Sequence, residues 1–295
     1  MKFPLVFIRF TQIISLLLLA GLLQACSSAK LAYNQAPELA YWYLDGYVDF
    51  SGVQSVQVKD DLNKLQTWHR QSQLPTYIDL LQKMQQKMPL DIHAQDACTL
   101  LSDVRAKFLL VSEQAQPAVV ALLDTMTHSQ LDTLARKFDK GNSDFRSDYM
   151  QTAKPVNQSK RYKQAINRAE MLYGRLDEKQ TSLIALQVEK SRFNASLAYA
   201  ERQRRQQDAL QTLRTLVKTP ATPEQKKLAI RGLFERSIMS PNSNYADYID
   251  ALTKDNCANL ANLHNTTSVS QRRQAMDVLV RYEQDIKTLA KQGNG

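Results

Sequence analysis

Helix-start signals recur along this chain, and they limit its fold more than any other pattern. In each copy a Ser, Thr or Asp stands three residues before a Gln. This is the capping box, in which the first side chain accepts a hydrogen bond from the third helical amide and the Gln bonds back to the cap. The five copies are Ser51–Gln54, Thr127–Gln130, Asp177–Gln180, Thr222–Gln225 and Ser268–Gln271. They predict a chain of many well-delimited helices.

Glycine content and apolar spacing support the same fold class. The 295 residues include only 8 glycines, which leaves little material for the hairpins and phosphate-binding loops that need positive φ. Apolar residues recur at helical spacing after the capping boxes. We therefore expect an all-α fold, either an elongated helical bundle or a helical-hairpin array. The expected shorter helices are 54–68, 74–88, 91–111, 115–126, 127–141, 160–173, 223–237, 244–264 and 268–292.

One expected helix is much longer. Residues 175–219 contain neither Gly nor Pro, so the sequence favours a single helix near 178–218, about 60 Å long at about 1.5 Å per residue. Its middle, 201–208, has no apolar residue to bury. We expect this section to bridge two sub-bundles through water, with a break in the section as the alternative.

Three arginines in this section, Arg202, Arg204 and Arg205, are the best candidates for a partner-binding patch. Guanidinium groups suit phosphate and carboxylate partners. The alternative is that these arginines pair along the helix with Glu201 and Asp208 and are otherwise solvated.

The amino terminus predicts where the protein goes. Lys2 and Arg9 accompany an apolar run, 13–23, that is too short to span a bilayer, so residues 1–25 form an expected signal peptide. The sequence Leu-Gln-Ala-Cys that ends at Cys26 fits the processing pattern of bacterial lipoproteins, in which this Cys is lipidated. Three acyl chains would anchor the mature chain stably. Ser27 in place of an Asp favours the outer membrane, facing the periplasm; ordinary secretory cleavage is the alternative.

Two further cysteines, Cys98 and Cys257, would then lie in an oxidising compartment, where cysteines usually pair. We expect a disulfide that closes a loop of about 160 residues. Two buried thiols on separate helices are the alternative.

An aromatic segment follows the expected anchor. Pro37 would open a helix that carries Trp42, Tyr43 and Tyr47. Trp and Tyr favour the membrane–water interface, but these rings could equally pack as core under later helices. The expected domains are the removed signal peptide 1–25, the lipidated tether helix 26–50, an N-terminal bundle 51–174, and the long helix with a C-terminal bundle 175–292.

Two resemblances follow from these residues. Cys26 followed by Leu-Ala-Tyr-Asn at 31–34 and Tyr-Trp-Tyr-Leu-Asp-Gly-Tyr-Val-Asp at 41–49 resembles a group of proteobacterial lipoproteins of unknown function. That likeness implies a helical lipoprotein over nearly the whole mature chain and no particular activity; Tyr173 stands where its pattern has Trp. The capping boxes are also similar to the Leu-Thr-x-x-Gln motif of periplasmic chaperones of the Spy and CpxP kind, which implies ATP-independent shielding of unfolded clients.

The sequence shows no catalytic or metal-binding motif. Its four histidines are never spaced as a ligand pair, and it contains no Gly-x-Ser-x-Gly, phosphate-binding loop, dinucleotide fingerprint or Cys-x-x-Cys. His69, beside Trp68, is the nearest candidate for an active site, and a structural hydrogen bond explains it more simply. We predict no cofactor and no metal.

Charge and compartment together indicate the class of partner. The formal charge is +9, of which two charges leave with the signal peptide. In the periplasm the anionic partners are lipid headgroups, lipopolysaccharide, peptidoglycan carboxylates and acidic proteins rather than nucleic acid. We expect a non-catalytic interaction or scaffold protein of the envelope. A client-shielding chaperone and an envelope enzyme are the alternatives, and the oligomeric state is left open.

Overall fold

The computed structural model describes residues 28–150 and 154–292, and the regular structure in these ranges is entirely helical. The expected signal peptide, residues 1–25, and Cys26 lie outside the described residues. The all-α prediction is confirmed. In chain order the elements are α2 (Ser28–Asn34), α3 (Ala36–Val48), α4 (Gly52–Trp68), the π-helical segment η1 (His69–Gln73), α5 (Leu74–Lys87), α6 (Ala94–Leu123), α7 (His128–Phe145), the π-helical segment η2 (Arg146–Met150), α8 (Lys154–Tyr173), α9 (Glu178–Glu189), α10 (Ala195–Lys218), α11 (Pro223–Ile238), α12 (Ser243–Asn265) and α13 (Val269–Lys291).

All five predicted capping boxes are present, with both hydrogen bonds formed at the starts of α4, α7, α9, α11 and α13. Pro223 occupies the first turn of α11, where its missing N–H costs nothing. Gly174 ends α8 with φ of 73°, a left-handed conformation that a side chain would strain.

Two pairs of these boxes are joined through their glutamines. Gln54 and Gln130 exchange amide hydrogen bonds of 3.2 and 2.6 Å, and Gln180 and Gln271 do the same at 2.8 Å in both directions. Each amide also donates to a main-chain carbonyl just before the partner helix; the acceptors are Thr125, Asp49, Thr266 and Arg175. The starts of α4 and α7, and of α9 and α13, are therefore fixed together by the same device.

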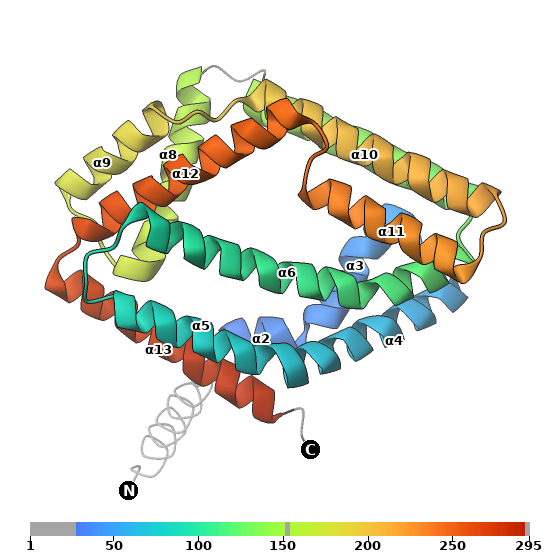
Figure 1. Cartoon of the computed structure of the whole chain (residues 1–295), viewed down its shortest axis with the longest axis horizontal. Coiled ribbons are helices and arrows are strands. Elements are labelled where there is room, and N and C mark those ends of the chain that lie inside the picture. Colours follow the sequence, from blue (N-terminus) through green and yellow to red (C-terminus); the bar gives the residue numbers. More distant parts are fainter. Residues whose placement is uncertain (1–27, 151–153, 293–295) are drawn as a thin grey trace, which may run out of the picture.

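The helices form an elongated frame, with α5 and α13 along one long side, α10 along the opposite side and α6 between them (Figure 1). α5 packs along α13, α6 against α12 and α11, and α7 against α10. Each of these pairs joins a helix from 51–174 to a helix from 175–292. The structure thus interleaves the two expected bundles instead of keeping them apart.

The predicted continuous helix near 178–218 is wrong. α9 ends at Glu189, and Asn194 caps α10, because its Oδ1 accepts from the amides of Ser196 and Leu197 at 3.0 and 3.1 Å. A capping side chain therefore stops the helix although no Gly or Pro is present. The polar section 201–208 also does not bridge two sub-bundles through water, because α10 packs between α7 and α11 and Glu201 is only 4% exposed.

A second difference concerns α6, which is one helix of 30 residues where two helices, 91–111 and 115–126, were expected. Pro117 lies inside it. An internal Pro removes a helical hydrogen bond and costs about 3 kcal/mol, so local preference predicts a boundary there. Packing of α6 against α4, α11 and α12 outweighs that preference.

The main core cluster lies where α5, α8, α9, α12 and α13 meet, around Tyr173, Ile184, Ala275 and Leu279. Beside it the structure joins Cys98 of α6 to Cys257 of α12 by a disulfide, with Cα atoms 5.3 Å apart and 159 residues of sequence separation. This is the pairing that the sequence favoured. A link across so long a loop stabilises a fold by about 2–5 kcal/mol.

Candidate functional site

The turn that joins α5 to α6, residues 88–93, is held by the corner where α12 meets α13. The Asn265 side chain bonds both backbone groups of Ile92, at 2.9 and 3.0 Å. The Arg272 guanidinium donates to the Pro89 carbonyl at 2.9 Å. These contacts send α5 away from the turn along α13 and α6 along α12, so the two helices do not close on each other.

His264 also binds this turn, from the protein interior. It is fully buried, and its Nε2 donates to the Leu90 carbonyl at 2.8 Å. A carbonyl only accepts, so Nδ1 is the unprotonated nitrogen and accepts from the Tyr173 hydroxyl at 3.0 Å. Burial lowers the pKa of His264 and raises the pKa of Tyr173 to about 12. Both groups are neutral at pH 7, and they tie the turn to α8.

The separation of α5 and α6 creates a long apolar groove. Two cavities, of about 290 and 620 Å³, lie along it and share Leu80 and Met84 of α5. On the opposite wall Val104 and Phe108 of α6 are 49% and 67% exposed. The larger cavity continues under α2, η1 and α13; its further apolar lining is Ala29, Leu74, Leu81, Val111, Ile286 and Leu289.

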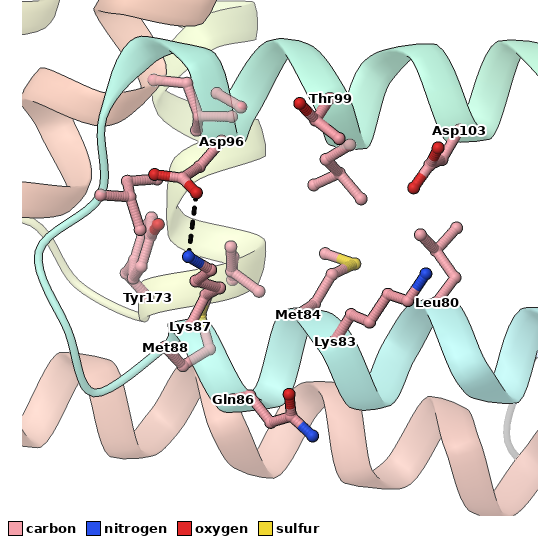
Figure 2. Close-up of a pocket in the computed structure, with 15 residues that line it drawn as sticks. Leu80, Lys83, Met84, Gln86, Lys87, Met88, Asp96, Thr99, Asp103 and Tyr173 are labelled. Carbon is pink, nitrogen blue, oxygen red and sulfur yellow. Dashed lines mark ion pairs between the residues drawn. The ribbon is translucent and has the colours of Figure 1, made fainter.

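Charged groups stand at the edges of this groove. Figure 2 shows the smaller cavity, where Lys87 of α5 and Asp96 of α6 form an ion pair of 2.9 Å close to the turn. Further along, Lys83 lies across the opening from Asp103. In the larger cavity Lys107 is the basic lining residue. The groove therefore offers an apolar interior with lysines and carboxylates at its rim.

The larger cavity also contains His69, the residue named as the nearest candidate for an active site. The Tyr33 hydroxyl lies 3.0 Å from its Nδ1, and the Tyr77 hydroxyl lies 2.9 Å from its Nε2. Burial lowers the pKa of His69 and raises the pKa of each tyrosine. Both ring nitrogens are thus occupied by neutral partners, an arrangement that fixes the ring in place.

The aromatic residues of α3 divide between buried and exposed positions. Tyr41 is buried and donates to Ser55 Oγ at 2.9 Å. Trp42 and Tyr43 point outward, 63% and 66% exposed, and the Tyr47 ring lies half-buried with its centroid 5.1 Å from that of Tyr43. α3 therefore packs with one side and leaves a large aromatic face on the other.

The arginine patch is engaged inside the fold. Arg202 donates to Asn142 Oδ1 of α7 at 2.9 Å. Arg204 donates to both Glu201 carboxylate oxygens at 2.9 Å, and Arg205 donates to one of them at 2.8 Å. Pairing along the helix, the alternative weighed for this segment, is thus observed, with a buried carboxylate at its centre.

This network explains how a wholly polar section of α10 can be buried. Burial alone would raise the pKa of Glu201, but hydrogen bonds from its two arginines and from Ser240 outweigh it and lower the pKa. Asp208 receives two hydrogen bonds from Arg236 of α11, at 2.9 and 2.8 Å, and they lower its pKa. Both carboxylates stay charged and link α10 to its neighbours.

Sequence reasoning missed the groove. Its shape depends on the hold that Asn265 and Arg272 exert on a turn more than 170 residues earlier in the chain. One signal was available: α6 carries apolar residues on more than one side, among them Val104, Phe108 and Val111 at helical spacing. That excess indicates a second apolar face beyond the one that packs on α12.

Comparison with known proteins gives the family and no activity. Within the described residues no helix is long and apolar enough to cross a membrane, and no group of three His, Cys, Asp or Glu side chains there could hold a metal ion. No curated protein and no solved structure matches the chain. A family of unknown function, DUF6279, matches residues 46–229, more than half of the 295. The chain belongs to this family of unknown function.

Proposed function

We propose that this protein is a non-catalytic interaction or scaffold protein of the cell envelope, anchored in the outer membrane through a lipid on Cys26 and facing the periplasm. The expected signal peptide 1–25, the Leu-Gln-Ala-Cys sequence and Ser27 support the anchor and its membrane. Its partners would be the lipid surface and an envelope protein, with no nucleic acid and no cofactor.

One observation carries this proposal: the outward face of α3. Leu39, Trp42 and Tyr43 lie three and four residues apart, so they share one face, and they are 58–66% exposed. Trp and Tyr are enriched at membrane–water interfaces, and this face follows Cys26 by fewer than twenty residues. α3 would rest on the lipid surface and orient the helical frame, which then presents its other sides to a periplasmic partner.

The rest of the fold suits a rigid platform. The disulfide, the two glutamine pairs and the ion network of α10 fix helices that are far apart in sequence. Because Arg204 and Arg205 neutralise Glu201, replacing them would first unsettle the fold. Trp42 and Tyr43 are therefore better contacts for an outside partner than the arginine patch.

Tryptophan fluorescence tests the membrane contact, because the chain has only two Trp residues. A mature chain with Cys26→Ser and Trp68→Phe keeps Trp42 as its only reporter. We expect its emission to shift to shorter wavelength on vesicles of phosphatidylethanolamine and phosphatidylglycerol, since the ring leaves water. The matched Trp42→Phe chain, which reports from Trp68, is expected to show no shift; equal spectra from Trp42 with and without vesicles would contradict the proposal.

Cross-linking in intact cells, followed by purification of the lipidated protein, tests the interaction role. One dominant envelope partner in fixed proportion would support a scaffold. An ATP-independent chaperone is the second candidate, because large apolar side chains outside the groove, such as Leu228, Met239 and Val269, are 60–78% exposed and could contact unfolded segments. A broad set of unfolded clients would favour that candidate, and recovery of no protein would contradict both.

A further inference from the structure

We propose that the groove between α5 and α6 is a binding site for one long hydrocarbon chain with an anionic head, such as a fatty acid. The site is separate from the outward face of α3 and does not depend on the membrane contact proposed above. It rests on three observations: the shape of the groove, the apolar character of its interior, and the position of Lys107.

The shape favours a thin ligand. A helix with its side chains is about 10–12 Å wide, so two turns of helix occupy roughly 850–1,200 Å³. The larger cavity holds about 620 Å³ and the smaller about 290 Å³, joined at Leu80 and Met84. Ligand pockets commonly have volumes of about 300–1,000 Å³ and bury most of the ligand surface. A partner helix of two turns would need all of both cavities, whereas a single extended alkyl chain needs only part of this elongated space.

The interior favours hydrocarbon over an extended peptide. Aliphatic side chains and Met84 line the middle of the groove, and the nearby polar rings of His69, Tyr33 and Tyr77 bond to one another. An extended peptide would bring one N–H and one C=O per residue into this space without partners, and each unpaired group opposes binding. An alkyl chain brings none.

The rim favours an anionic head at the level of Lys107. Asp285, the carboxylate of the larger cavity, is paired with Lys30 at 3.3 Å, and Lys87 of the smaller cavity is paired with Asp96. Lys107 has no such ion pair among the residues that the structure describes; Lys83 of the smaller cavity also has none, but it faces Asp103. A ligand carboxylate beside Lys107 would gain a charge partner while its chain filled the groove.

The test uses the mature chain with Cys26→Ser, which changes no described residue. Titration with palmitate below its micelle concentration is expected to give saturable binding of one molecule per chain. Val104→Glu and Phe108→Glu place a carboxylate on the groove wall, and each is expected to weaken binding at least tenfold. Both side chains are about half exposed or more, so these variants keep the fold, which thermal unfolding verifies.

Leu228→Glu on α11 is the matched control, because Leu228 is also an exposed apolar residue but lies outside both cavities. It is expected to bind palmitate like the parent chain. Lys107→Gln is expected to weaken palmitate about three- to tenfold and to leave the neutral analogue hexadecanol unchanged. No saturable binding by the parent chain, or equal weakening by Val104→Glu and Leu228→Glu, would overturn the proposal.

Discussion

Helix α5 has two neighbours and meets them in opposite ways. α13 packs along α5, and the Glu283 carboxylate of α13 accepts hydrogen bonds from Gln82 and Gln85 at 2.9 and 2.6 Å. α6 follows α5 directly in sequence but stays apart from it, linked by the Lys87–Asp96 ion pair near the turn. One side of α5 is a closed, hydrogen-bonded interface, and the other is an open apolar groove.

This difference shows that apolar surface alone does not decide whether two helices close. α5 presents apolar side chains to both neighbours. The open side stays open because the turn is bonded to the α12–α13 corner and because α6 is attached to α12 through Cys98–Cys257. Helices joined by a short turn usually pack as a hairpin; here each one packs instead on a helix from the C-terminal half.

The strongest way to break this arrangement is to remove the disulfide. The double variant Cys98→Ser, Cys257→Ser is expected to lose about 2–5 kcal/mol of unfolding free energy, because the unfolded chain is freed from a long closed loop. Urea unfolding under oxidising conditions measures the loss. Reducing agent is expected to lower the unfolding free energy of the parent chain by a similar amount and to leave that of the double variant unchanged. A urea midpoint in the double variant equal to that of the oxidised parent chain would contradict the prediction.

A smaller effect is expected at the glutamine pair that fixes α9 to α13. Gln180→Ala removes a fully buried amide and leaves the Gln271 amide and the Thr266 carbonyl short of partners, at a cost of about 2–3 kcal/mol. Gln225→Ala is the matched control, since Gln225 is exposed and bonds only within its own capping box in the described contacts. It is expected to lose about 0.5–1 kcal/mol. If urea unfolding gave equal losses of unfolding free energy for Gln180→Ala and Gln225→Ala, the hydrogen bonds between paired glutamines would add no stability beyond the capping box.

Local signals predicted much of this fold because they act over three or four residues. Ser51, Thr127, Asp177, Thr222 and Ser268 each begin a helix as expected. Two of the misplaced boundaries have opposite causes. At Asn194 a capping side chain was overlooked, whereas at Pro117 a correct local preference is overruled by packing.

The groove and the buried ion network could not be predicted in this way. Glu201 is buried because its arginines neutralise it, and it bonds to Ser240 on the segment between α11 and α12. A window of sequence shows only a polar run there. Likewise, nothing near Leu90 indicates that His264 will hold it. Such sites depend on contacts between distant residues, which single-sequence patterns do not report.

Lowering the pH tests the closed interface between α5 and α13. Hydrogen bonds from Lys287, Gln82 and Gln85 lower the pKa of Glu283 to about 2, against about 4.3 in an unfolded chain. The unfolded state therefore binds the proton first, so the stabilisation is complete above about pH 5.5 and is lost as pH falls toward about 2. Across this pH range, the urea midpoint of unfolding is expected to fall more steeply with decreasing pH in the parent chain than in Glu283→Gln. Glu224→Gln, an exposed control, should follow the parent; identical slopes for all three would contradict the prediction.

The smallest expected effect distinguishes an open groove from one that closes in solution. If α6 stays apart from α5, Val104 remains about half exposed, and Val104→Glu changes the unfolding free energy by no more than about 0.5 kcal/mol, as Leu228→Glu does. If α6 instead folds onto α5, the new carboxylate is buried without a partner and costs several kcal/mol. Urea unfolding of the two variants, side by side, separates these cases. Because the disulfide holds α6 on α12, the small effect is expected with Cys98–Cys257 intact, and a larger one only after reduction.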